Sequence, residues 1–170
     1  TQQCRKEDLS RVVAIYEAAK QKSDIKIFFD DISERIRNSH LVISRSGAST
    51  IAELSVIGRP AILIPYQFAI DNHQKINADA MVKSGGAWSF DESNLEPETL
   101  ANFLAEILTD HERLRSAAHA SHNFGIPESS EILANLISEA TKTNILALKS
   151  KFKQTNNTQR LEGDHEKTPN

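Results

Sequence analysis

The sequence predicts an α/β fold in which a doubly wound parallel sheet carries helices on both faces. Four short apolar runs are typical of buried strands, and they cover residues 25–29, 41–43, 61–64 and 87–90. Segments with helical periodicity separate these runs. Because parallel strands need crossover connections, this alternation indicates a parallel sheet. Ligands of such sheets bind beyond the carboxyl ends of the strands, so we expect function in the loops after Phe29, Ser44 and Ile64.

The first part of the chain predicts a helix, a strand and a second, short helix. A helix is expected at about residues 6–22 because apolar residues recur on one face, namely Leu9, Val12, Val13 and Tyr16. The strand at 25–29 follows. Asp30 and Asp31 are suited to cap a short helix that ends near Arg37.

Residues 40–53, HLVISRSGASTIAE, are the stretch around which we expect the function to be organised. The apolar run breaks at SRSG, residues 44–47, and a helix is expected from Ala48 to near Gly58. A helix that begins just beyond a strand directs unpaired backbone N–H groups and the positive end of its dipole at one spot. An anion, most often a phosphate, is favoured there.

The second half of the chain continues the alternation. Pro65 ends the strand at 61–64, and a polar loop leads into a helix at about 73–84, which Gly85 and Gly86 close. Three further helices are expected after the strand at 87–90: one that begins at Pro97 and two near 111–123 and 127–142.

Composition and charge indicate a single globular domain followed by a tail. The chain has 170 residues, of which 39% are hydrophobic, and its net charge of -3 argues against a nucleic-acid partner. Apolar periodicity ends at Leu148, so we expect one domain at 1–148 and a polar, disordered tail at 149–170. Residues 142–170 carry six Lys or Arg against three acids, which could aid weak contact with an anionic membrane surface or do nothing.

The single cysteine and the lack of long apolar runs indicate the cellular compartment that we expect. Cys4 has no partner for an internal disulfide, which fits a reducing cytoplasm. No run approaches the roughly 18 apolar residues of a membrane span. The chain begins with Thr1 rather than Met, so we expect it to be a piece of a longer protein.

Small residues crowd the predicted turn and helix start at 46–50. A ligand could approach the backbone closely here, and the hydroxyl groups add donors. The alternative is an ordinary capped helix with Ser46 or Ser49 as its N-cap, since N-caps favour these residues. Glu53 could accept hydrogen bonds from a ribose, or it could be a first-turn acid that complements the helix dipole.

The loop and helix start at 66–77 are rich in amide, imidazole and carboxylate groups. Amides both donate and accept hydrogen bonds, as the recognition of sugar hydroxyls requires. Asp71 or Asn72 could simply cap the helix that follows. Capping does not explain Gln74 and Asn77, which lie three apart on one face of the first turn.

Other chemistry has little support in the sequence. His119 and His122 have helical spacing, but no third ligand is evident, so a solvated helix face is the better interpretation and no metal is expected. Ser46 lacks the leading glycine of a nucleophile elbow. Neither a Gly-x-x-x-x-Gly-Lys loop nor a Gly-x-Gly-x-x-Gly motif is present.

Several ordered motifs stand together at a spacing typical of one enzyme family. They are VISRSGASTIAE at 42–53, GRPA at 58–61, PY at 65–66, DNHQ at 71–74 and NA at 77–78. With them, the chain from about Gln2 to Ala140 resembles the C-terminal half of the MurG family of bacterial glycosyltransferases. The resemblance implies a B-type glycosyltransferase fold, in which two Rossmann-like domains face each other across a cleft. It also implies the inverting transfer of N-acetylglucosamine from UDP to a lipid-linked muramoyl-pentapeptide, the conversion of lipid I to lipid II in peptidoglycan synthesis.

The resemblance implies that nine residues line the UDP-N-acetylglucosamine site: Arg45, Ser46, Gly47, Ala48, Ser49, Glu53, His73, Gln74 and Asn77. The turn and helix start would lie at the diphosphate, with backbone N–H donors from Ala48 and Ser49. Glu53 would bind the ribose hydroxyls. His73 and Gln74 would lie near the phosphates and the sugar hydroxyls, and Asn77 would support their loop. No metal or other cofactor is implied, because helix dipoles and backbone donors would stabilise the departing UDP.

The family's glycine-rich phosphate loop and its N-terminal domain would precede Thr1. That domain would bind the lipid acceptor, contact the membrane and supply the catalytic base, so no catalytic residue is assigned and the chain alone should be inactive. The implied location is cytoplasmic, peripheral on the inner face of the plasma membrane. Two other functions stay open at this point: a UDP-N-acetylglucosamine 2-epimerase-like enzyme of the same architecture, and a non-catalytic Rossmann-like interaction module.

Overall fold

The computed structural model describes residues 1–142, which form two units, Thr1–Ile126 and a second unit that begins at Pro127. The tail expected at 149–170 lies outside the described residues. The first unit alternates strands and helices in this order: β1 (Gln2–Gln3), the 3-10 turn η1 (Lys6–Asp8), α1 (Leu9–Ala18), β2 (Ile25–Lys26), α2 (Ile32–Arg37), β3 (Val42–Ser44), α3 (Ala48–Ile57), β4 (Ala61–Leu63), the 3-10 turn η2 (Ile70–Asn72), α4 (His73–Lys83), β5 (Ala87–Ser89), the 3-10 turn η3 (Glu92–Asn94), α5 (Pro97–Thr109) and α6 (His111–Phe124). The described part of the second unit contains a helix over 129–142.

The strands of the first unit are parallel, which confirms the predicted fold class. The order β3-β4-β5 makes one sheet, with Ile43 opposite Ile62 and Ile62 opposite Trp88. β1 and β2 make a second, two-stranded sheet. Each strand of the larger sheet is followed by a helix or a 3-10 turn, so the loops after β3, β4 and β5 meet at the carboxyl edge of that sheet.

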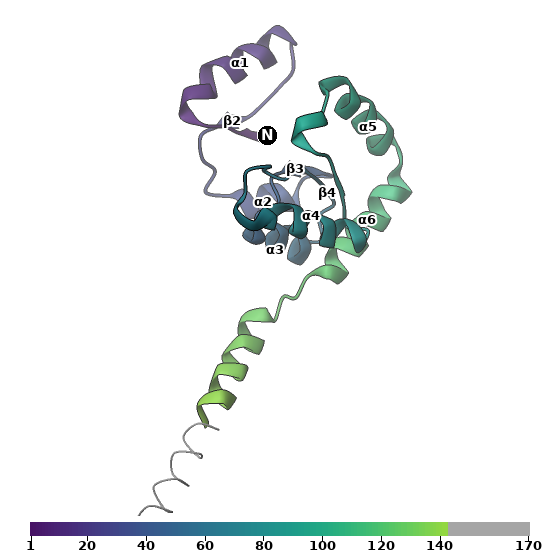
Figure 1. The fold of residues 1–170 in the computed structure, drawn as a ribbon. Helices are drawn as coiled ribbons and strands as arrows, with labels where there is room; N and C mark the ends of the chain where they lie inside the picture. The colour runs from purple at the N-terminus through teal and green to yellow at the C-terminus, as the bar shows by residue number, and fades with distance from the viewer. Residues whose placement is uncertain (143–170) are drawn as a thin grey trace, which may run out of the picture. The chain divides into compact units, whose positions relative to one another are not determined.

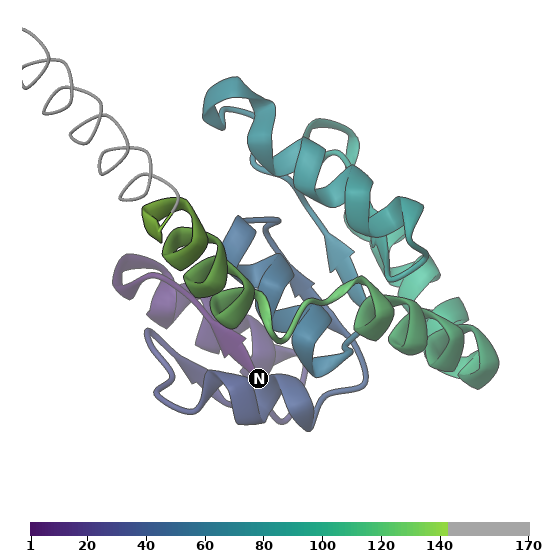
Figure 2. The same ribbon diagram turned by 90° about the horizontal axis from the view of Figure 1, so that it is seen from below.

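Helices cover both faces of the larger sheet. α2 and α4 each contact α3, and the three helices form a layer beside β3 and β4 (Figures 1 and 2). Leu54 of α3 and Met81 of α4 are fully buried in one cluster with Leu63 of β4. On the other face, Trp88 of β5 contacts Phe103 of α5, with 5.6 Å between ring centroids. Full burial of a side chain such as Leu54 or Leu63 stabilises the fold by about 1.5–3 kcal/mol. The buried cluster of Leu54, Met81 and Leu63 therefore stabilises the sheet that carries the loops.

Two predicted elements end earlier in the structure, and one short strand lies where none was expected. α1 ends at Ala18 rather than near residue 22, since Lys20 adopts a left-handed backbone conformation with φ of 53°. β2 ends at Lys26 rather than at 29, and Phe28 beyond it is 65% exposed. β1 was not expected, because two polar residues carry no periodic signal.

The C-terminal end of α3 is anchored by α6. Gly58 ends α3 as predicted, in a left-handed conformation with φ of 74°. Ser121 of α6 donates from its hydroxyl to the carbonyl oxygens of Leu54 (3.3 Å) and Arg59 (3.1 Å). A Cβ atom on Gly86 would lie 2.8 Å from the Cα of Ser121, so glycine is required where β5 approaches α6. These contacts fix the C-terminal end of α3 against α6. Its N-terminal end lies at the carboxyl edge of the sheet.

No helix within residues 1–142 is long and apolar enough to cross a membrane.

Candidate functional site

The start of α3 is an uncapped helix N-terminus. Gly47 occupies the N-cap position with extended backbone angles, and no described side chain accepts a hydrogen bond there. The alternative in which Ser46 or Ser49 caps this helix is therefore wrong, because Ser46 lies before the cap and its hydroxyl points inward. Ala48 and Ser49 are exposed. Their N–H groups and the helix dipole remain directed at the space beyond β3, where an anion is favoured.

Ser46 joins the start of α3 to the start of α4. Its side chain is fully buried, and its hydroxyl donates to the backbone oxygen of Gln74 over 2.7 Å. The amide nitrogen of Asn77 in turn donates to the backbone oxygen of Ser46 over 3.0 Å. The two predicted segments, 45–49 and 73–77, thus form one connected unit. The Ser46 hydroxyl is already committed to a protein acceptor.

The loop before α4 has an unusual backbone. Asp71 and Asn72 are consecutive residues with left-handed angles, φ of 52° and 55°. Asn72 stands at the N-cap position of α4, but its side chain makes no capping hydrogen bond. Helix capping therefore does not explain why an asparagine occupies this position. The Gln74 side-chain oxygen accepts from the Tyr66 backbone N–H over 3.0 Å, which leaves its amide nitrogen to donate elsewhere. Strain of this kind persists where the surroundings fix it, often at ligand sites.

Arg45 ties the loops after β3, β4 and β5 together. Its Nη1 donates to the backbone oxygens of Ile64 (3.2 Å) and Pro65 (3.3 Å). Both terminal nitrogens donate to the Glu92 carboxylate, Nη1 to Oε2 over 2.8 Å and Nη2 to Oε1 over 2.6 Å. The hydrogen bond from Arg45 lowers the pKa of the Glu92 carboxyl, and Glu92 raises the pKa of the guanidinium.

Glu92 is the residue of this region that the sequence interpretation missed. It lies just beyond β5, at the same carboxyl edge as the other two loops, and is separated from Arg45 by 47 residues. No short-range pattern marks such a pair. The rule that ligands bind beyond strand ends could have brought the loop after β5 into consideration.

The remaining predicted site residues are accessible. Glu53 is exposed on α3 and makes no ion pair with any residue between 1 and 142. His73 is exposed in the first turn of α4. The structure therefore brings Ser46, Gln74 and Asn77 into contact, whereas Glu53 makes no contact with them that would fix its orientation.

The loop after Phe29 is organised separately. The Arg35 guanidinium lies 4.0 Å from the Phe29 ring centroid and donates to Asp31 (2.7 Å) and Asp24 (2.6 Å). The hydrogen bond from Arg35 lowers the pKa of Asp31. Asp31 stands at the N-cap of α2 as predicted, but its carboxylate binds Arg35 and does not cap the helix.

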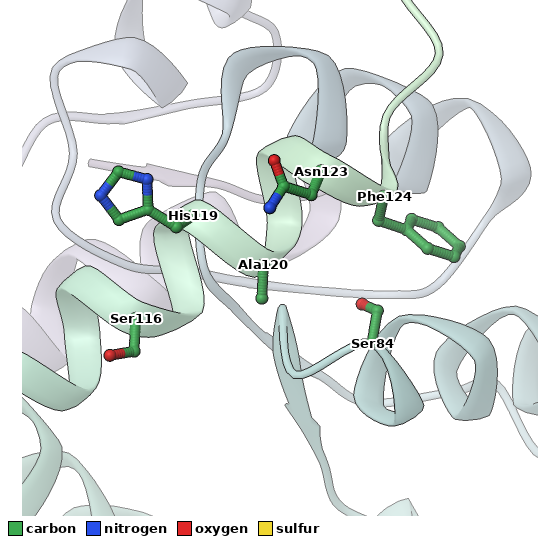
Figure 3. Close-up of a pocket in the computed structure, with 6 residues that line it drawn as sticks. All are labelled: Ser84, Ser116, His119, Ala120, Asn123 and Phe124. Atoms are coloured by element: carbon green, nitrogen blue, oxygen red, sulfur yellow. The ribbon is translucent and has the colours of Figure 1, made fainter.

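One surface pocket lies away from these loops. It has a volume of about 550 Å³ and is lined by Ser84, Ser116, His119, Ala120, Asn123 and Phe124 (Figure 3). Ser84 precedes β5, so this pocket lies at the amino end of that strand, opposite the edge where the candidate site lies. Residues 1–142 contain no group of three or more His, Cys, Asp or Glu that could hold a metal ion, and His119 and His122 find no third ligand there.

Comparison with known proteins identifies the relatives of this fold. The model of the glycosyltransferase family 28 C-terminal domain matches residues 1–136. A Rhodospirillum rubrum protein named UDP-N-acetylglucosamine–N-acetylmuramyl-(pentapeptide) pyrophosphoryl-undecaprenol N-acetylglucosamine transferase is 46% identical over 138 residues, 81% of this chain and 36% of its own. A protein of the same name from Allorhizobium ampelinum is 46% identical over 137 residues, 81% of this chain and 37% of its own.

Solved structures agree with these relatives. The crystal structure of Acinetobacter baumannii MurG superimposes with a TM-score of 0.74 at 27% identity, over 81% of this chain and 42% of that one. Glycosyltransferase VinC in complex with DTDP has a TM-score of 0.55 at 14% identity, over 75% of this chain and 32% of its own, and shows the fold alone. These likenesses confirm the resemblance and the Rossmann-like fold that it implied. The chain spans little more than a third of the length of the two sequence relatives.

Proposed function

The chain belongs to glycosyltransferase family 28 through its C-terminal domain, and we propose that it is the UDP-N-acetylglucosamine-binding part of an inverting N-acetylglucosaminyltransferase that converts lipid I to lipid II. Within it, the domain expected at 1–148 would hold the sugar donor. The names of the sequence relatives favour this transferase over the 2-epimerase and over a non-catalytic module.

The observation that carries the proposal is the uncapped start of α3, joined to α4 through Ser46. A diphosphate placed beyond β3 would accept hydrogen bonds from the backbone N–H groups of Ala48 and Ser49. The charge on the departing UDP increases as the glycosidic bond breaks, and donors aimed at that charge lower the barrier. This arrangement needs no metal ion for leaving-group stabilisation.

Neighbouring side chains supply contacts to the rest of the donor. Glu53 is an exposed carboxylate, which suits the two hydroxyls of a ribose as acceptor. The Gln74 amide nitrogen and the His73 ring would form hydrogen bonds with the sugar hydroxyls and the phosphates. Asn77 would keep Gln74 in place through Ser46.

Several parts of the reaction lie beyond this chain in the proposal. The lipid-linked muramoyl-pentapeptide would be bound by the second domain of the enzyme, which would also provide the catalytic base. The assembled enzyme would work at the cytoplasmic membrane surface as a peripheral protein. The isolated chain should then bind the donor without turning it over.

Titration calorimetry on the full-length enzyme tests the proposal. We expect saturable binding of UDP and of UDP-N-acetylglucosamine, with no requirement for a divalent metal. Formation of UDP only when the lipid-linked acceptor is present would support a transferase. The proposed function would be refuted if neither UDP nor UDP-N-acetylglucosamine bound to the folded enzyme. It would also be refuted if the enzyme released an epimerised nucleotide sugar without acceptor.

A further inference from the structure

We propose that Glu92 is a positioning residue of the donor site, acting through Arg45 on the loops that hold the diphosphate. This inference rests on the proposed function, since it concerns the same site. It assigns a role to a residue outside the nine expected from the sequence.

The geometry places Arg45 at the junction of three loops. Its guanidinium donates to the backbone oxygens of two consecutive residues after β4 and to both oxygens of the Glu92 carboxylate after β5. Arg45 itself directly follows β3, and two residues separate it from the start of α3. One side chain therefore links all three strand ends of the larger sheet. A two-point contact between planar groups also fixes orientation, which a single contact does not.

The position of Arg45 affects the backbone donors of α3. Ser46 follows Arg45 directly and is bonded to Gln74 and Asn77, so a shift of Arg45 would be transmitted to the start of α4. Donors at a helix start are effective only when they hold the right geometry, and small displacements lower affinity. Glu92 fixes that geometry without contacting the ligand.

Two roles for this ion pair predict opposite effects of removing Glu92. If Glu92 positions the loops, its loss weakens nucleotide binding. If it instead neutralises Arg45 and holds it back from the phosphates, its loss frees a cation and strengthens binding. The Arg45 Nη1 also donates to two backbone oxygens of the loop after β4, so the guanidinium joins that loop to Glu92. This bridging geometry favours the positioning role.

The test compares Glu92→Ala, Glu92→Gln and the control Asp91→Ala in the full-length enzyme. Asp91 is an adjacent exposed acid whose side chain makes no ion pair or hydrogen bond within residues 1–142. We expect Glu92→Ala to weaken UDP binding about fivefold, equivalent to about 1 kcal/mol since 1.4 kcal/mol is tenfold. Glu92→Gln keeps an oxygen that accepts from Arg45, and should recover most of the affinity.

Steady-state kinetics separate positioning from general destabilisation. Glu92→Ala should raise the KM for the sugar donor and leave the KM for the acceptor unchanged, whereas partial unfolding would lower kcat alone. Affinity for UDP that is unchanged or tighter in Glu92→Ala, or lowered equally in Asp91→Ala, would overturn the inference. If the unsubstituted enzyme failed to bind UDP, the proposed function itself would fail, which is a separate result.

Discussion

Replacing Asn77 tests whether the starts of α3 and α4 form one unit. The Asn77 amide donates to the backbone oxygen of the fully buried Ser46 over 3.0 Å. Removing the donor leaves that carbonyl unpaired at a cost of about 1–2 kcal/mol. Alanine returns up to about 0.7 kcal/mol through its higher helix propensity. We therefore expect Asn77→Ala to lower the free energy of unfolding by about 1 kcal/mol.

Asn77→Asp sharpens this prediction, because it keeps the shape of the side chain and removes the donor. At neutral pH the introduced carboxylate would face the Ser46 carbonyl oxygen, and there is no gain in helix propensity, so the loss should be about 2–3 kcal/mol. Below the carboxyl's pKa the protonated group can donate, so the deficit should shrink in acid. The free energy of unfolding is measured by urea titration with the fluorescence of the single tryptophan, Trp88.

Asp79→Ala on the same helix is the matched control. Asp79 is exposed and lies 3.5 Å from Lys75 in a surface pair, so its loss should change stability by less than about 0.5 kcal/mol. The reasoning would be refuted if Asn77→Asp were as stable as the unsubstituted protein at neutral pH, or if Asp79→Ala were equally destabilising.

Three further predictions follow from the packing, the site and the charges. Gly86→Ala should lower the free energy of unfolding by about 2 kcal/mol, because the new Cβ would lie 2.8 Å from the Ser121 Cα; a neutral result in urea titration would contradict this. Glu53→Ala should weaken UDP binding by roughly tenfold, as expected for a lost charged hydrogen bond, and unchanged affinity in calorimetry would make the ribose assignment wrong. The Arg45 hydrogen bond lowers the pKa of Glu92, so the pair stabilises the fold above the ordinary carboxyl value and this stability is lost as pH falls through the folded pKa. Glu92→Gln should accordingly remove part of the acid dependence of unfolding, which would be disproved by superimposable pH profiles.

Local sequence signals predicted the elements around the site well. Gly58 marked the end of α3 because a left-handed residue is needed there, and Pro97 marked the first residue of α5. The turn at 44–47 followed from small residues after an apolar run. Each of these features depends on residues that are neighbours in the chain.

Features that depend on distant residues were not predictable from the sequence. Ser46 resembles an N-cap by type, but its hydroxyl bonds to Gln74, 28 residues away. The Arg45–Glu92 pair joins loops that only the folded sheet brings together. Lys20 ends α1 through a backbone conformation that its residue type does not favour.

A crystal structure of the full-length enzyme with UDP-N-acetylglucosamine tests the central claim most directly. The account predicts diphosphate oxygens within about 3.2 Å of the Ala48 and Ser49 backbone nitrogens, the ordinary range of N–H···O hydrogen bonds. It also predicts that the Arg45–Glu92 pair stays intact beside the ligand. A diphosphate bound elsewhere, such as the pocket beside His119 at the opposite edge of the sheet, would contradict it.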